Sequence, residues 1–487
     1  MSMRDLDLLS AGMPGIETGA RERLTEKVLQ YGEGAFLRAF ADYMFDVLNQ
    51  KGLFDGGITV VQPIREGMAE AIAAQDGLYT LIARGMENGE PAVQTRVITS
   101  ITGCVDPYTR FDEYIKSAQN PELRYVVSNT TEAGIAYDPG DGPDDRPQNS
   151  FPGKVTAFLR ERYLHFGGDA SKGLVFLPCE LIDDNGGKLK RMVTRYAREW
   201  GLDEGFLKWV DSANVFTNTL VDRITPGYPH GEAASLCGEL GYRDGLLDTC
   251  ELFHFWAIEG PGWLEKELPF AKAGLNVVFT GDASEYKRRK VRLLNGAHTC
   301  SALAAFLCGI DTVGEMMADA DFSRYLRAAL YDEIIPTLGL ERDVLNSYAD
   351  SVLERFANPY INHYLLSITL NSVPKFKVRV LPSILEYMRR SGAPPQILTF
   401  SLAALIAFYK GVKRGGGSPS YQPADSAENL EILKNGNVRE ILGRADLWGA
   451  DLTVYRDFRR GVENALAGIT KDGMRAAVRR LVRNGFY

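Results

Sequence analysis

The chain lacks the features that mark secreted or membrane-spanning proteins. Its cysteines carry no C-x-x-C pair and fit neither a zinc ribbon nor a disulfide framework. The N-terminal MSMRDLDLLSAG has no apolar stretch long enough for a secretion signal. The longest apolar runs, SALAAFLCGI and TFSLAALIAFY, are far shorter than the roughly 20 residues of a spanning helix. We therefore expect a cytoplasmic protein with no membrane partner. The six cysteines are residues 104, 179, 237, 250, 300 and 308.

Positive charge is also in deficit. Lys and Arg number 55 against 63 Asp and Glu, and the formal net charge is -8 with no basic tail or stripe. This argues against a nucleic-acid partner, because nucleic-acid phosphates demand clustered Lys and Arg. A small anion held by a few local cations is still allowed. With 487 residues, the chain is long enough for two large domains.

The first half of the chain has a regular alternation. Short β-rich runs alternate with segments whose apolar residues recur at i, i+3 and i+4. This pattern predicts an α/β domain over residues 1–280, Rossmann-like and doubly wound, with a mainly parallel sheet. Helical patterns dominate afterwards and predict a mostly α-helical domain over residues 281–487. The β-rich runs are VLQY (28–31), ITVVQPI (58–64), YTLIAR (79–84), TRVITSITG (95–103), RYVVSN (124–129) and LVFLPC (174–179).

The first glycine-rich turn lacks the third glycine of the dinucleotide fingerprint G-x-G-x-x-G, since residue 37 is leucine. Gly32 and Gly34 would still allow a tight turn and a close approach of the backbone to a pyrophosphate. Arg38 stands where a basic side chain could reach a phosphate. An ordinary glycine turn of an α/β domain explains the same residues equally well. The turn reads Tyr31, Gly32, Glu33, Gly34, Ala35, Phe36.

The acid expected about 20 positions later is missing too. The second strand ends VVQPIREG and offers Gln62 or Arg65 near a ribose, so these residues leave NAD and NADP both open. Another strand ends in SNTTEAG, which places Ser128, Thr131 and Glu132 at the carboxyl edge of the sheet, where doubly wound folds bind ligands. A helix N-cap would explain the Ser and Thr equally well.

Histidine is scarce, with five in the chain, and one of them lies in KVRLLNGAHTC. At ~100° per residue, Lys290, Asn295 and His298 share a broad arc of one helix and could converge on one small molecule. A lysine can act as general base toward an alcohol where its pKa falls from ~10.4 toward ~7–8. An amide can donate to an oxygen as charge develops, and a histidine can orient a hydroxyl. An exposed basic helix face with an ordinary histidine fits the spacing at least as well.

Together these segments resemble the mannitol dehydrogenase family of polyol-specific long-chain dehydrogenases. The likeness lies in G-x-G-x-F-x-R-A (32–39), SNTTEAG, K-x4-N-x2-H (290–298) and FTNTLVDRITP (216–226). The resemblance implies that the two-glycine turn is a cofactor motif, with NAD bound and NADP not excluded. It also implies Lys290 as catalytic base, Asn295 and His298 on substrate oxygens, and no metal. The cofactor residues it implies are Tyr31, Gly32, Glu33, Gly34, Ala35, Phe36, Arg38, Ser128, Thr131 and Glu132.

Departures from the polyol members point to one branch of this family. Polyol members carry Cys-Asp-Asn where this chain has Cys179-Glu180-Leu181, and leucine cannot supply the amide that helps to stabilise an alkoxide. Lys287 stands where polyol members can have a glutamate. With LPCELIDDNG (177–186) and NSVPKFKVRVLPS (371–383), the chain resembles the tagaturonate reductase (altronate oxidoreductase) branch, whose substrates are sugar acids. The resemblance implies reversible reduction of D-tagaturonate by NADH to D-altronate.

An anionic sugar acid needs a cationic partner. Lys375, Lys377 and Arg379 fall at alternate positions and would share one face if the segment is extended, so that one or more could meet the substrate carboxylate. A solvated basic face is the alternative. Fructuronate, mannitol or a phosphorylated polyol are rival substrates, and a nucleotide- or sugar-binding regulator without turnover is a rival of another class. The sequence does not indicate an oligomeric state.

Overall fold

A computed structural model describes residues 4–7, 15–19, 24–131, 133–415 and 421–484. The chain divides into two compact units, one of residues 1–84 and 92–283 and the other of residues 85–91 and 284–487. The sequence places a single boundary near residue 280. It does not anticipate that residues 85–91, where β5 (Tyr79–Glu87) gives way to β6 (Glu90–Ile98), belong with the second unit.

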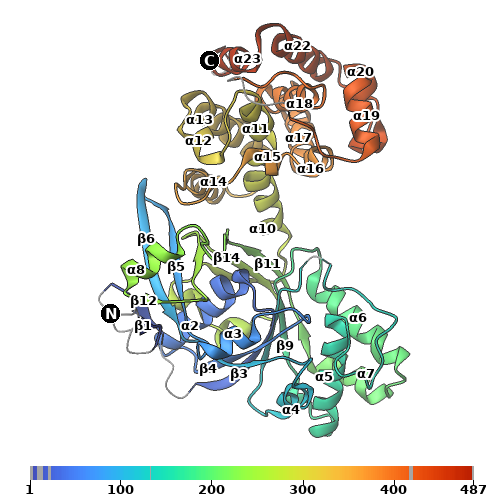
Figure 1. The fold of residues 1–487 in the computed structure, drawn as a ribbon. Coiled ribbons are helices and arrows are strands. Elements are labelled where there is room, and N and C mark those ends of the chain that lie inside the picture. Colours follow the sequence, from blue (N-terminus) through green and yellow to red (C-terminus); the bar gives the residue numbers. More distant parts are fainter. Residues whose placement is uncertain (1–3, 8–14, 20–23, 132, 416–420, 485–487) are drawn as a thin grey trace. The chain divides into compact units, whose positions relative to one another are not determined.

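The first unit is built on a six-stranded sheet whose strand pairs are all parallel (Figure 1). Its order is β10-β9-β8-β3-β4-β7, so the chain winds outward from β3 in one direction and then returns to start again at β8. The predicted doubly wound α/β fold is thereby confirmed, and its topological switch point lies between β3 and β8. The strands are β3 (Thr25–Tyr31), β4 (Gly56–Val61), β7 (Ile101–Val105), β8 (Tyr125–Ser128), β9 (Val175–Pro178) and β10 (Val215–Phe216).

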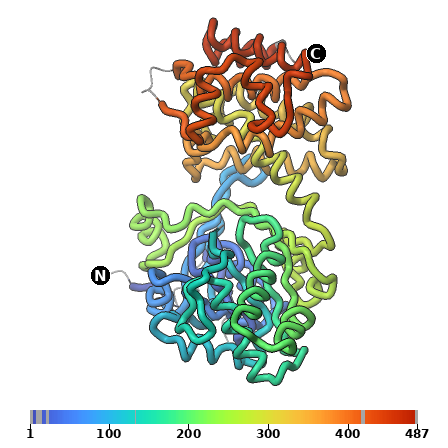
Figure 2. The backbone as a smooth tube through the Cα atoms, turned by 90° about the vertical axis from the view of Figure 1, so that its right-hand side faces the viewer, coloured from blue at the N-terminus to red at the C-terminus, as the bar shows by residue number. Residues whose placement is uncertain are grey.

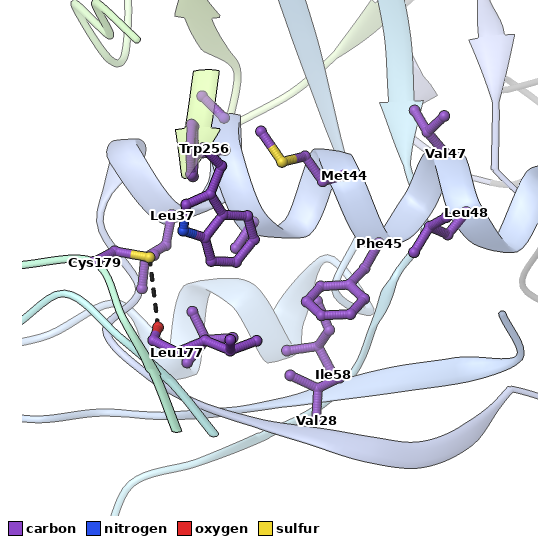
Figure 3. Packing of buried hydrophobic residues seen from close by; sticks show 14 of the residues in the cluster. Val28, Leu37, Met44, Phe45, Val47, Leu48, Ile58, Leu177, Cys179 and Trp256 are labelled. Atoms are coloured by element: carbon purple, nitrogen blue, oxygen red, sulfur yellow. Dashed lines mark hydrogen bonds between the residues drawn. The ribbon is translucent and has the colours of Figure 1, made fainter. Parts of the chain in front are cut away.

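Helices cover both faces of this sheet, and each face has its own hydrophobic core. Val28 and Leu29 are adjacent in β3 and fully buried, but they belong to opposite cores because side chains alternate along a strand. On the face of Val28, Phe45 of α2 (Tyr43–Gln50) and Trp256 complete the packing (Figure 3). The other face is covered by α5 (Phe151–His165), α6 (Asn185–Glu199) and α7 (Glu204–Ala213). Burial on both faces explains the near-continuous apolar runs of these strands.

Smaller sheets complete the first unit. The predicted strand 95–103 is in fact two strands in different sheets, β6 and β7. Between them the backbone N–H of the buried Thr99 donates to Asp46 Oδ1 instead of to a neighbouring strand. The remaining strands are β1 (Arg4–Asp5), β2 (Glu17–Thr18), β11 (Asn218–Asp222), β12 (Tyr242–Arg243), β13 (Asp248–Cys250), β14 (Phe255–Glu259) and β15 (Val277–Thr280). The short helices are α3 (Ala69–Ala74), α4 (Phe111–Lys116), α8 (Ala233–Leu240) and α9 (Leu264–Glu267).

Apart from the ends of β5 and β6, the second unit is helical, as predicted (Figure 2). The two apolar runs noted in the sequence form α11 (Gly296–Leu307) and α18 (Gln396–Tyr409), which are buried on all sides and pack against each other. Among the described residues, no helix combines the length and the apolar character needed to cross a bilayer. The other helices are α10 (Ser284–Arg289), α12 (Val313–Ala318), α13 (Ala320–Arg327), α14 (Arg342–Phe356), α15 (Leu365–Ile368), α16 (Ser372–Arg379), α17 (Leu381–Ser391), α19 (Ala427–Asn435), α20 (Val438–Leu442), α21 (Ala445–Trp448), α22 (Arg456–Asp472) and α23 (Met474–Asn484).

Candidate functional site

The glycine-rich turn joins β3 to a helix that begins with α1 (Ala35–Leu37) and continues through a π-helical turn, Arg38–Asp42, into α2. Gly32 has φ +128°, in the region that favours glycine. A Cβ at this position would lie 3.0 Å from Asn129 O and 3.0 Å from Leu37 Cδ1. The leucine in the place of the third glycine therefore packs against the first glycine, and the turn is closed without a third one.

Gly34 is different, because nothing in the described protein requires a glycine there. Its φ of -69° and ψ of 165° suit any residue, and an added Cβ would have no neighbour within 4 Å. The residue is exposed at the amino end of the helix, where backbone N–H groups are free to bind an anion. Open space at this point fits a pyrophosphate that approaches the backbone closely.

Replacing Gly34 with valine is expected to weaken cofactor binding without weakening the fold. The new Cβ would have no protein atom within 4 Å and the backbone angles suit valine, so the thermal midpoint should stay unchanged. The Kd for NADH, measured by fluorescence titration, should rise at least about tenfold, or ~1.4 kcal/mol. Gly32→Ala is the matched contrast and should lower the thermal midpoint as well. Unchanged NADH affinity in Gly34→Val would show that the cofactor does not pass this residue.

Two side chains of the predicted cofactor set point into the protein. Arg38 is 2% exposed; its NH1 donates to Leu246 O at 2.5 Å, and its NH2 lies 3.8 Å from Asp248 Oδ2. The expectation that Arg38 reaches a phosphate is therefore wrong. Instead it opposes the effect of burial, which raises the pKa of Asp42 to about 8 and of Asp248 to about 7. Tyr31 is likewise buried, with its hydroxyl 2.7 Å from that of Tyr114.

The other side chains of the turn lie nearer its surface. Ala35 and Phe36 are half-buried, and Phe36 stacks on Phe40 with ring centroids 5.0 Å apart. Glu33 is 7% exposed, and its Oε1 accepts a hydrogen bond from Met68 N, while Oε2 has no hydrogen-bond partner among the described residues. Burial raises the pKa of Glu33, and the Met68 N–H opposes this shift. A buried carboxylate oxygen without a donor fits a ligand that carries hydroxyl groups.

The end of β8 is held by a buried carboxylate that the sequence identified only as a departure from polyol members. Ser128 Oγ donates to Glu180 Oε2 at 3.1 Å, and Thr130 N and Oγ1 both donate to Glu180 Oε1 at 3.0 Å. Thr131 follows with φ +74°, a strained value for a β-branched residue, and is exposed. The next described helix begins at Phe151, so these residues are not an N-cap. Glu132 lies outside the described residues.

Leu181, which stands where polyol members have an asparagine, is an exposed apolar residue. Leu181 follows the end of β9 and is 59% exposed. The nearby Asn185 does not replace the missing amide, because it is buried and its Nδ2 donates to Pro178 O, Glu180 O and Thr219 O. In the first unit, therefore, neither residue can donate to a substrate oxygen.

The ends of β4 and β7 are joined by an aromatic side chain between two cations. The Arg65 guanidinium and the Lys154 ammonium both lie 5.0 Å from the centre of the Tyr108 ring. Lys154 is fully buried and donates to Asn149 O at 2.9 Å and to Tyr108 Oη at 3.1 Å. Burial lowers the pKa of Lys154 from 10.5 to about 8, and nearby Asp141 partly opposes this.

Stability should consequently depend on pH in the alkaline range. Because the pKa of Lys154 is lower in the folded than in the unfolded protein, the folded protein releases this proton first. Its contribution to stability should therefore rise between about pH 8 and ~10.4, by a few kcal/mol. Thermal midpoints across this range should show the rise in wild type and in the exposed control Lys116→Met, but not in Lys154→Met. A common slope in all three proteins would contradict the assignment.

In the second unit, Lys290 begins a π-helical turn, Lys290–Asn295, between α10 and α11. This corrects the regular helix assumed from the sequence, because i→i+5 hydrogen bonding brings residues five apart together along the helix. Lys290 and Asn295 are consequently closer in direction than a regular helix would place them, and both are half-buried. Short π-helical turns of this kind occur frequently at functional sites.

His298 lies one turn further, in α11, and is 9% exposed. Its ring stacks on Phe356 at 4.0 Å between centroids and meets the edge of the His363 ring at 5.0 Å. Sequence reasoning missed His363, which is half-buried and whose pKa is lowered by burial. Its only signal was the scarcity of histidine. The packed rings hold the His298 imidazole in one orientation.

The cationic segment 371–383 is helical, so the expected single face of three cations is wrong. In α16, residues two apart point to different sides, whereas Lys375 and Arg379 are four apart and share a face. Lys377 Nζ donates to Asp446 O at 3.2 Å, and Lys375 Nζ donates to Ile368 O at 3.0 Å. Arg379 NH1 lies 3.5 Å from Thr299 Oγ1, which places this cation beside the start of α11.

The same two helices meet closely at a glycine. A Cβ at Gly296 would lie 3.2 Å from Arg379 O, so a larger residue would push α16 away from the Lys290–His298 segment. The second unit thus brings Asn295, His298 and Arg379 into one region. No group of three or more His, Cys, Asp or Glu suited to a metal ion occurs among the described residues.

Comparisons with known proteins agree with both halves of this description. The mannitol dehydrogenase Rossmann domain matches residues 26–272, and the mannitol dehydrogenase C-terminal domain matches residues 282–470. The chain is 47% identical over 467 residues to altronate oxidoreductases of Escherichia coli K12 and Shigella flexneri serotype 5b, covering 94% of this chain and 97% of each relative.

Two solved structures share the fold. A substrate-free D-sorbitol dehydrogenase matches with a TM-score of 0.83 and 22% identity, over 98% of this chain and 100% of the other. The Pseudomonas fluorescens mannitol 2-dehydrogenase, solved with NAD and D-mannitol, matches with a TM-score of 0.69 and 24% identity, over 97% of both chains. The resemblance read from the motifs is confirmed, and the chain belongs to the mannitol dehydrogenase family of oxidoreductases.

Proposed function

We propose that this protein is a cytoplasmic, NAD-dependent enzyme that interconverts D-tagaturonate and D-altronate. The observation that carries the proposal is the 47% identity, over nearly the full length of both chains, to proteins named altronate oxidoreductase. The motif K-x4-N-x2-H and the shared cationic face of Lys375 and Arg379 are the features of this chain that suit a sugar acid.

The dinucleotide would bind at the carboxyl edge of the six-stranded sheet. Gly32 and Gly34 would leave room for the pyrophosphate, and Ala35 and Phe36 would form the first residues of the helix that follows. Ser128 and Thr131 would line the neighbouring strand end, which Glu180 holds in place. When bound, the nicotinamide supplies a hydride to a ketone or accepts one from an alcohol.

The proton is handled by the second unit. Lys290 Nζ would donate a proton to the carbonyl oxygen in reduction and would remove it from the alcohol when altronate is oxidised. Asn295 Nδ2 donates a hydrogen bond to the same oxygen as negative charge develops on it. His298, held by Phe356, orients a neighbouring hydroxyl, and Arg379 with Lys375 meets the carboxylate. This route uses no metal.

A substrate screen tests the assignment. NADH oxidation is followed at one enzyme concentration with D-tagaturonate, D-fructuronate and D-fructose, and NAD reduction with altronate, mannonate and mannitol. We expect kcat/KM for tagaturonate to exceed that for each rival ketone at least about a hundredfold. A higher kcat/KM for fructuronate or fructose would assign the protein another activity of the family. NADH binding without any turnover would instead identify a regulator.

A further inference from the structure

We propose that Glu33, between the two glycines of the turn, is the carboxylate that binds the adenosine ribose and makes the protein prefer NADH to NADPH. This inference rests on the proposed nicotinamide chemistry and names the residue that selects the cofactor. Dinucleotide-binding folds usually place such an acid at the end of the second strand, where it accepts a hydrogen bond from the ribose 2′-hydroxyl.

That usual position cannot perform the task in this chain. The second strand, β4, is followed by Gln62, whose amide is already used to hold the next loop. Its Nε2 donates to Ile64 O and Arg65 O at 3.0 Å, and its Oε1 accepts from Ala69 N at 3.3 Å. Gln62 is therefore committed to the loop backbone and is 5% exposed.

Glu33 brings a carboxylate to this same strand end from the other side. Its Oε1 accepts from Met68 N, which begins the helix after the β4 loop, so the side chain spans from the glycine turn to β4. Among the described residues, Oε2 has no hydrogen-bond partner, although the residue is 93% buried by its 7% exposure. A buried carboxylate oxygen without a donor is costly, and a ribose hydroxyl is a donor that would satisfy it.

The residue that packs against the Glu33 carboxylate is a glycine, Gly67, which has no side chain. A Cβ at Gly67 would lie 2.0 Å from Glu33 Oε1 and 2.4 Å from Gln62 Cδ, so no side chain fits at that position. Gly67 itself is exposed, as are its neighbours Arg65 and Glu66. The carboxylate therefore lies against an exposed residue of the β4 loop, and this is the side from which a ligand hydroxyl would reach it.

The charges around Glu33 decide against a 2′-phosphate. Asp106, at the end of β7, acts on Glu33 as a second negative charge. The opposing cation is Arg38, but its guanidinium is buried and turned toward Leu246 O and Asp248. Arg65 of the β4 loop is exposed and lies over the Tyr108 ring. Because Arg38 is already bound to Leu246 O and Asp248, and the exposed Arg65 acts through a higher effective dielectric than the buried Glu33, repulsion of a 2′-phosphate should dominate.

The first experiment needs only the wild-type protein. Bound NADH is displaced, with fluorescence as the readout, by 5′-AMP, by 2′-deoxy-5′-AMP and by adenosine 2′,5′-bisphosphate. We expect 5′-AMP to compete at least about tenfold better than either of the others. It alone has a 2′-hydroxyl, since the 2′-deoxy form has lost this group and the bisphosphate carries a charged phosphate in its place. Equal competition by 5′-AMP and its 2′-deoxy form would overturn the proposal.

The second experiment compares variants by the Kd of NADH and of NADPH, with thermal midpoints as the folding control. In Glu33→Gln we expect the Kd of NADH to rise about tenfold to a hundredfold while that of NADPH does not rise, so that the preference collapses. Glu26→Gln, in the strand that precedes the turn, should match wild type. An equal loss for both cofactors would assign Glu33 to the Met68 contact alone, and a wild-type preference for NADPH that Arg65→Ala removes would make Arg65 the selector. Either result would overturn the inference.

These titrations contain no sugar-acid substrate, so either proposal can fail while the other holds. A protein that binds NADH selectively through Glu33 but turns over none of the sugar acids keeps this inference and loses the proposed function. A protein that reduces tagaturonate equally well with both cofactors keeps the function and loses this inference.

Discussion

Replacing Lys290 with methionine is expected to lower kcat for tagaturonate reduction by roughly 10³-fold, within the range that general acid–base catalysis contributes. The substituted side chain keeps the length of the lysine but carries no proton to donate to the carbonyl oxygen. NADH absorbance in the steady state gives kcat, and fluorescence titration should give an unchanged Kd for NADH, because the glycine turn is untouched.

The control is Arg288→Met, which removes an exposed cation two residues earlier on α10 and should keep full activity. Lys290→Ala adds a test that distinguishes a chemical role of the lysine from a structural one. Small primary amines in solution should restore part of its turnover, since they can supply the missing proton. If Lys290→Met folds normally and retains kcat within tenfold of wild type, the lysine is not the acid–base group.

Replacing Asn295 with alanine is expected to lower kcat by about 10²–10³-fold, the usual loss when one donor to a developing oxyanion is removed. The loss should fall on kcat more than on KM, because the charge exists only in the transition state. A large effect is expected here because neither Leu181 nor Asn185 offers a second amide.

Asn295→Asp sharpens this test. It keeps the shape of the side chain but removes the donor and adds a negative charge, so it should be at least as inactive as the alanine variant. Pre-steady-state measurement of the hydride-transfer step distinguishes chemistry from product release. A rise in KM with kcat unchanged in both variants would mean that Asn295 only binds the substrate.

The strand before the glycine turn and the turn itself were predictable because they depend on neighbours in sequence. Val28 and Leu29 lie in an apolar run that ends at two glycines, and the structure places a parallel strand and a sharp turn there. The Lys290, Asn295 and His298 pattern was also readable, since helical spacing alone places them on one arc. The structure replaces the regular helix with a π-helical turn over Lys290–Asn295, and the roles of the three residues stay a prediction.

The direction of Arg38 could not be predicted. Its position in the motif suggested a phosphate, but its partners Leu246 O and Asp248 are about two hundred residues away in the chain. The prediction of a shared cationic face in segment 371–383 was wrong for a related reason. Alternating cations suit an extended strand, yet the packing of Phe376 and the contact of Arg379 with Thr299 accompany a helix.

The sequence by itself therefore determined the local elements, the two-glycine turn and the family, because these are written in short-range patterns of apolar residues and in motif spacing. Only the tertiary structure decided that Arg38 is buried, that Glu180 holds the end of β8, and that Glu33 reaches the β4 loop with one oxygen unsatisfied. Each of these depends on a partner brought close by the fold, and a side chain's hydrogen bonds and charge environment exist only once that partner is in place.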